Sequence, residues 1–116
     1  MINLSGINPN MIANNLNPSD PIHPGEIIKD EIEYNGITQK QLAERTGISY
    51  SIISEIIHGK RQVSVEYAML LDAALNIDAD MLINMQMSYN KEMALKNPTL
   101  ADRLKAIRKA AASIAL

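Results

Sequence analysis

An all-α fold is predicted by three features of this 116-residue sequence. Apolar residues recur at steps of three and four from Pro24 onward, which is the spacing of one face of a helix. Residues that cap helices, such as Ser, Thr, Asp and Gly, separate the segments with this spacing. No stretch shows sustained alternation of apolar and polar residues, so strands are not expected. Because hydrophobic residues make up 47% of the chain and Phe and Trp are absent, the core must be aliphatic.

The composition argues against several classes of protein. With no Cys, the chain can form neither a disulfide, nor a thiolate nucleophile, nor a Cys-ligated zinc site. Its two histidines are far apart and no Gly-rich phosphate loop is present, so we expect no metal, no cofactor and no enzymatic activity. No apolar run approaches the roughly 18 residues of a membrane span, and the N-terminus lacks the order of a signal peptide. We therefore expect a soluble cytoplasmic protein that does not bind membranes.

The first 22 residues are rich in Asn and Pro, which favour turns, so residues 1–22 are predicted to form a flexible tail. The first helix is expected to begin at Pro24, because the first helical position tolerates proline. Glu26 then lies in the first turn, where a negative charge interacts favourably with the helix dipole. The pair Asn35-Gly36 provides a left-handed stop.

The remaining helices follow from their capping residues. Thr38 caps a short second helix that Gly47 closes, and Ser49 caps a third that ends at His58-Gly59. A fourth helix follows Ser64, with an apolar stripe of Val65, Ala68, Leu71 and Leu75. A fifth follows Asp78, with a stripe of Leu82, Met85, Tyr89 and Met93.

A sixth helix opens at Pro98, after Asn97 interrupts the pattern. It is amphipathic, and its apolar positions are Leu100, Leu104, Ile107, Ala111 and Ile114. We therefore expect a helical domain over residues 23–95 and a separate amphipathic helix over residues 96–116. This last helix could pack in a dimer, contact DNA or bind an acidic partner, of which dimer or partner contact is favoured.

Two short helices that meet at a tight turn need three kinds of residue at fixed spacings: a small one, one that tolerates a positive φ, and apolar ones on the inner faces. Ala43 is a small residue where the helix axes approach, and Gly47 tolerates a positive φ four positions later. Apolar residues must line the inner faces, and those available are Leu42, Ile48, Ile53 and Ile56. This pattern predicts a helix-turn-helix motif, in which the second helix presents its outer face to the major groove of double-stranded DNA.

The predicted DNA contacts follow from this geometry. Base edges are expected to be read from the N-terminal half of the second helix of the motif, by Tyr50, Ser51, Ser54 and Glu55. Phosphates are expected to be bound by Gln39, Lys40, Ser49, Lys60 and Arg61. The net charge of −2 neither supports nor excludes DNA binding, because basic side chains that share one face bind phosphates locally.

Some of these residues have a structural alternative. Ser49 is first of all a helix cap, and Lys40 could be no more than a solvated surface charge. Glu55 could accept a hydrogen bond from a cytosine amino group, or it could pair with Arg61. His58 is expected to end its helix rather than to bind a ligand.

The motif resembles the lambda-repressor and Cro-like helix-turn-helix domains, often called XRE-type. When the flanks are included, the chain is similar to HigA-type antitoxins over about residues 23–93, because four further segments match: 23–28 (HPGEII), 36–39 (GITQ), 59–61 (GKR) and 84–90 (NMQMSYN). The chain departs from the family at Thr46, where an apolar residue is usual, at Met81-Leu82, where aromatic residues are usual, and in its extension over residues 97–116.

The resemblance implies a lambda-repressor-like domain of five helices, here with an additional C-terminal helix. It also implies a homodimer that represses its own operon and silences an mRNA-cleaving toxin, a small basic ribonuclease. Two recognition helices in such a dimer would read an inverted-repeat operator. A stand-alone regulator without a toxin, and a protein-binding domain without DNA affinity, remain alternatives. The methionines are expected to fill the core or the dimer seam rather than an adaptable partner surface.

Overall fold

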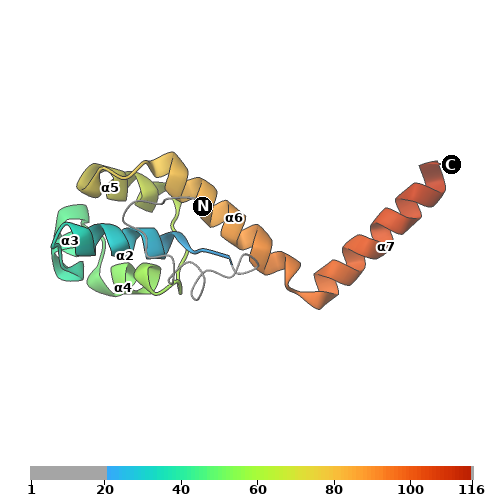
Figure 1. Ribbon diagram of the computed structural model, residues 1–116, viewed down its shortest axis with the longest axis horizontal. Coiled ribbons are helices and arrows are strands. Elements are labelled where there is room, and N and C mark those ends of the chain that lie inside the picture. The colour runs from blue at the N-terminus through green and yellow to red at the C-terminus, as the bar shows by residue number, and fades with distance from the viewer. Residues whose placement is uncertain (1–20, 116) are drawn as a thin grey trace, which may run out of the picture.

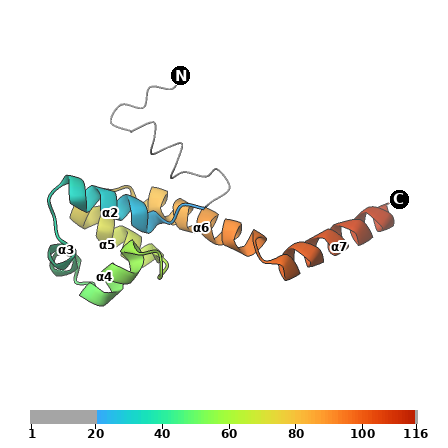
Figure 2. The same ribbon diagram turned by 60° about the horizontal axis from the view of Figure 1, so that its bottom comes forward.

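The computed structural model describes residues 21–115, which contain six helices and no strand (Figure 1). The predicted tail over residues 1–22 lies outside the described residues, apart from Pro21 and Ile22. The helices are α2 (Pro24–Tyr34), α3 (Gln39–Thr46), α4 (Tyr50–Ile57), α5 (Val65–Leu75), α6 (Ala79–Leu95) and α7 (Pro98–Ala115). Figures 1 and 2 show α2 to α5 gathered in one body, from which α6 runs outward, while α7 projects away from this body. The predicted all-α fold is confirmed.

The core is aliphatic, as the composition requires. Its fully buried members come from α2, α3, α4, α5 and α6, and they include Ile28, Leu42, Ile53, Leu71 and Leu82. All four residues predicted for the inner faces of the helix-turn-helix motif are buried in this one cluster. The motif is therefore held by the same core as the rest of the body.

The helix ends form where the capping residues predicted them. Thr38 Oγ1 accepts a hydrogen bond from the Gln41 backbone N–H, and Gln41 Oε1 accepts one from the Thr38 backbone N–H, which makes a complete capping box. Ser49, Ser64 and Asp78 accept similar bonds at the starts of α4, α5 and α6. Such bonds span only two or three residues, so the local sequence is sufficient to specify them.

The start of α2 lies against the end of α4. Pro24 and Gly25 are buried, and a Cβ placed on Gly25 would overlap the carbonyl oxygen of Ile56. Only glycine allows the two backbones to approach this closely. His23 precedes them as the N-cap, and its Nδ1 accepts a hydrogen bond of 2.9 Å from the Gly25 backbone N–H.

Two expectations about burial are wrong. Val65 was expected in the buried stripe of α5, but it is the first residue of the helix and 59% exposed. Met93, in the last turn of α6, is 45% exposed. Of the two places expected for the methionines, the core does not hold Met69, Met81, Met87 and Met93, which are exposed, and the dimer seam stays a prediction.

The stripe of α7 is only partly covered, with Leu100 and Leu104 half-buried. Ile107 and Ile114 are exposed, and no α7 residue joins the core cluster. Within residues 21–115, no helix is long and apolar enough to cross a membrane.

Candidate nucleic-acid interface

The turn between α3 and α4 is fixed by its own residues. Gly47 has a φ of 76°, the left-handed conformation that the sequence predicted, and its N–H donates to the Ala43 carbonyl. Thr46 Oγ1 donates to the Leu42 carbonyl at 2.8 Å and accepts from the Ile48 N–H at 3.1 Å. The Thr46 hydroxyl therefore connects the end of α3 to the turn that precedes α4.

The outer face of α4 begins with exposed polar side chains. Tyr50 is 56% exposed and Ser51 is also exposed, so both are accessible to a ligand. Ser49 Oγ accepts from the Ile52 N–H at 3.3 Å, so its capping role is confirmed. Ser54 is half-buried, and its Oγ lies 3.5 Å from Nδ1 of His58.

Glu55 and Arg61 form an ion pair, with 2.7 Å between Oε1 and Nε. It is the one ion pair that the structure shows within residues 21–115. Both side chains are a little under half exposed. Of the two alternatives for Glu55, pairing with Arg61 is therefore the one realised in this structure. Because a guanidinium has five N–H donors, Arg61 keeps donors for a second acceptor.

The other predicted phosphate-binding residues lie around α4. Lys40, in the first turn of α3, and Lys60, after α4, are both exposed. Gln39 is half-buried, and its Oε1 is shielded from solvent without a hydrogen-bond partner. Since a phosphate only accepts hydrogen bonds, Gln39 could bind one through Nε2 or through the backbone N–H at the start of α3.

A polar network on α6 holds the loop that carries Lys60 and Arg61. Gln86 is buried, and its Oε1 accepts a hydrogen bond of 2.8 Å from the Val63 backbone N–H. Gln86 Nε2 donates to Asn90, whose Nδ2 donates to the side chain of Gln62 at 2.8 Å. The sequence of residues 84–90 matches the family but did not predict what Gln86 does. Its role is to fix the loop after α4 in position.

His23 holds the same loop from the other side. Its ring is buried, lies edge-on to Tyr89 with 4.9 Å between centroids, and packs against Gly59. Burial lowers the pKa of His23 below its ordinary value of 6.5, while a backbone hydrogen bond with Arg61 and the charge of Glu26 act in the opposite direction. His23 and Gly25 of the HPGE segment thus position the backbone rather than bind a ligand. The feature of the sequence that could have indicated this role is the glycine directly after His-Pro.

No cluster of His, Asp or Glu within residues 21–115 is arranged to hold a metal ion. The exposed face of α4 offers hydroxyl and phenol groups, and the loop after it offers the Arg61 guanidinium and the exposed Lys60. Such a face can make hydrogen bonds to base edges and charged contacts to phosphates.

Comparisons with known proteins agree with this geometry. A family model described as "Helix-turn-helix" matches residues 28–82. Virulence-associated protein I of Dichelobacter nodosus is 34% identical over 79 residues, which are 67% of this chain and 73% of that protein. An addiction module antidote protein of the HigA family from Coxiella burnetii is 30% identical, with a TM-score of 0.65 over 78% of this chain and 94% of that one.

The antitoxin HigA of Pseudomonas aeruginosa, solved with the higBA promoter, is also 30% identical, with a TM-score of 0.63. The match covers 75% of this chain and 90% of that one. These similarities confirm the resemblance that the sequence segments carried. The chain belongs to the HigA-type antitoxins of the XRE-type, lambda-repressor-like helix-turn-helix family.

Proposed function

We propose that this protein is a sequence-specific, DNA-binding transcriptional repressor and the antitoxin of a HigBA-type toxin–antitoxin module. The observation that carries the proposal is the exposed outer face of α4, with Tyr50 and Ser51 at its start and Lys60 and Arg61 in a fixed loop at its end. A relative of the same fold was solved with its promoter, which supports DNA as the ligand of this face.

In the proposed mechanism, residues 23–95 form the DNA-binding domain, and two copies pair through α5 and α6. Pairing places two α4 helices about one DNA turn apart, roughly 34–36 Å, on an inverted-repeat operator. Base edges are read by Tyr50, Ser51, Ser54 and Glu55, and phosphates are bound by Gln39, Lys40, Ser49, Lys60 and Arg61. Repression follows because the dimer occupies the promoter, and the protein acts in the cytoplasm without enzymatic activity.

The ion pair gives Glu55 and Arg61 a combined role. A carboxylate alone would repel the phosphate backbone, but Arg61 balances its charge. Glu55 in turn fixes the direction of the guanidinium, which is then presented to a phosphate through its remaining donors.

Titrations of variants against an operator and an unrelated DNA, at several salt concentrations, test the proposal. Lys60→Ala should weaken binding to both DNAs alike and reduce the salt slope by about one. Ser51→Ala should weaken operator binding by about 1–3 kcal/mol and leave binding to the unrelated DNA unchanged. Lys109→Ala on α7 removes the same charge as Lys60→Ala and serves as the control. If Lys60→Ala and Ser51→Ala behave alike, the division of roles is wrong.

Removing the carboxylate next to Arg61 is a second test. Glu55→Gln should tighten binding to unrelated DNA, because it removes a negative charge from the interface and releases Arg61 for phosphate contact. The same titrations measure this effect, and Glu33→Gln on α2 is the matched control. A variant that binds unrelated DNA more weakly than the natural protein would contradict this role of Glu55.

The toxin requires its own experiment, because a stand-alone regulator would bind DNA in the same way. Expression of the neighbouring open reading frame should arrest growth by cleaving mRNA, and co-expression of this protein should restore growth. A neighbour without any effect on growth would favour the stand-alone regulator.

A further inference from the structure

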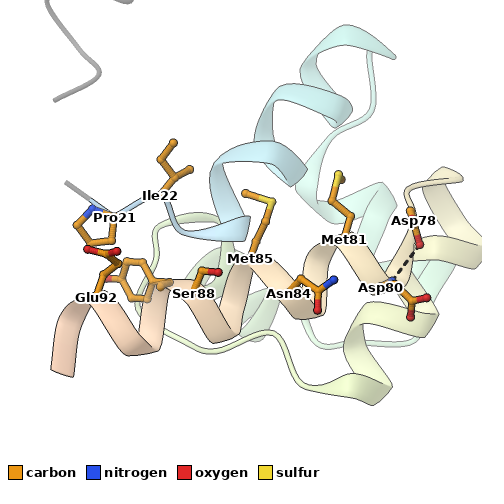
Figure 3. Close-up of a pocket in the computed structure, with 10 residues that line it drawn as sticks. Pro21, Ile22, Asp78, Asp80, Met81, Asn84, Met85, Ser88 and Glu92 are labelled. Atoms are coloured by element: carbon orange, nitrogen blue, oxygen red, sulfur yellow. Dashed lines mark hydrogen bonds between the residues drawn. The ribbon is translucent and has the colours of Figure 1, made fainter. Parts of the chain in front are cut away.

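A groove with a volume of about 640 Å³ lies between α6 and residues 21–22 (Figure 3). Met81 and Met85 form its middle, while Asp80 lies near the start of α6 and Glu92 at the far end. The groove is therefore mainly apolar in the middle, where Asn84 and Ser88 are its polar members, and acidic at both ends. None of the residues predicted to contact DNA lines it.

The complementary surface is found on α7 of the same chain. At 3.6 residues per turn, Arg103 and Arg108 lie on either side of the apolar stripe, and Lys105 and Lys109 lie on the opposite face. The C-terminal part of the stripe is exposed, with Ile114 at 84%, while Leu100 and Leu104 are half-buried. This face of α7 is thus apolar in the middle and basic at its edges, which is the reverse of the charge pattern of the groove.

The corner before α7 turns the helix away from the groove of its own chain. Asn97 Oδ1 accepts a hydrogen bond of 2.9 Å from the Thr99 N–H, and Pro98 is the first residue of the helix. These contacts fix how α7 starts, and Figures 1 and 2 both show it pointing away from the body. No residue of α7 lines the groove of its own chain in this structure, whereas a second molecule can bring its groove to the exposed positions of α7.

We propose that α7 of each copy docks in the α6 groove of a second copy, so that the two chains exchange their C-terminal helices. The proposal rests on the dimer of the proposed function and specifies the segment that completes it. Charge favours this occupant, because residues 62–90 hold four carboxylates and no basic residue, while residues 91–116 hold six basic residues against two carboxylates. Exchanged helices are a common route to dimers.

The dimensions of the two surfaces agree. With a rise of 1.5 Å per residue, α7 is about 27 Å long and residues 78–92 span about 21 Å, so one helix covers the groove. The exposed methionines suit such a contact, since their flexible side chains adapt to the partner. Docking removes from water the stripe of α7 and Met81 together, which provides the driving force.

The test uses full-length variants with reversed charges and measures the dimer dissociation constant by sedimentation. One variant carries Arg103→Glu and Arg108→Glu, and the other carries Asp80→Lys and Glu92→Lys. Each alone should dimerise at least about tenfold more weakly than the natural protein, because like charges then face each other. An equimolar mixture should restore the natural affinity, since each altered helix meets an oppositely altered groove.

Two matched variants provide the controls, and circular dichroism checks that every variant is folded. Lys105→Glu with Lys109→Glu changes the same charge on the opposite face of α7, and Asp30→Lys with Glu33→Lys does so on α2. Both controls should dimerise as the natural protein does.

Three outcomes would overturn the proposal. Unchanged dimerisation of the charge-reversed variants would show that α7 does not take part. Weak dimers that the mixture does not restore would show that these side chains support dimerisation through another contact than α7 in the α6 groove. Equal weakening by the variants and their controls would show an effect of net charge only. Dimerisation is measured without DNA. If the natural protein did not bind an operator, this would therefore contradict the proposed function and not the exchange of helices.

Discussion

The body formed by α2 to α6 and the helix α7 differ in how much each depends on single residues. In the body, one backbone contact at Gly25 and one buried side chain, Gln86, connect elements far apart in the sequence. In α7, whose described side chains are all exposed or half-buried, the helix is specified by local capping and propensity alone. The same kind of substitution should therefore have very different effects in the two regions.

The body and α7 also differ in how far they match the family. The HPGE segment and the Gln86–Tyr89 segment both hold the loop after α4, which carries two of the predicted phosphate contacts. Two of the family segments thus hold this loop in place, while the segments 36–39 and 59–61 include predicted phosphate contacts themselves, Gln39, Lys60 and Arg61. The α7 extension is where the chain departs from the family. Its apolar face is not buried in the core of the same chain.

The largest effect is expected at Gly25. Gly25→Ala should destabilise the protein by at least about 3 kcal/mol, because the new Cβ would overlap the Ile56 carbonyl and force α2 away from α4. Gly36→Ala is the control: its Cβ would meet no atom within 4 Å, so only the positive φ of 67° costs energy, about 1–2 kcal/mol. Urea unfolding measures both, and equal losses would mean that the close approach is not important.

A matched pair of Ala→Gly changes compares the two regions directly. Ala68→Gly in α5 should cost about 2 kcal/mol, since it lowers helix propensity and removes a fully buried methyl group. Ala110→Gly in α7 lowers the same propensity at an exposed position, so unfolding of the body should change by less than about 0.5 kcal/mol. Urea unfolding at low protein concentration measures both. A cost at Ala110 equal to that at Ala68 would show that α7 belongs to the cooperative unit of the body.

The smallest effect is expected from the pH dependence of His23. Burial lowers its pKa in the folded protein, so the unfolded chain binds the proton first as the pH falls. Stability should be complete above the unfolded value near 6.5 and should decrease as the pH is lowered from there towards the folded pKa. Melting temperatures between about pH 7.5 and 5.5 measure this decrease.

His23→Asn provides the control for that experiment. Asparagine keeps an acceptor for the Gly25 N–H but does not titrate in this range. Its melting temperature should therefore depend less on pH than that of the natural protein. An equal dependence in both proteins would assign the titration to other groups.

Much of the fold could be predicted because its signals are local. The caps at Thr38, Ser49, Ser64 and Asp78 and the left-handed Gly47 each depend on neighbours within a few residues. The inner face of the helix-turn-helix motif followed from its spacing. The burial of Val65 and Met93 could not be predicted in this way, because periodicity shows which residues share a face and not whether another element covers it.

The same distinction applies to the candidate site. The exposed start of α4 followed from assigning its apolar residues to the core, and this could be done from the sequence. The pairing of Glu55 with Arg61 could not be decided, since it depends on how the chain turns after His58. The role of Gln86 could not be predicted either, because its hydrogen-bond partner Val63 lies 23 residues away in the sequence.

By itself, the sequence determined the helices, their order, the aliphatic core and the helix-turn-helix motif, since these depend on capping bonds and spacing along the chain. Only the tertiary structure decided which apolar faces are covered, why Gly25 must be glycine and what holds the loop after α4. Those features arise where segments distant in sequence meet, and the strength of such a contact depends on the geometry of both partners.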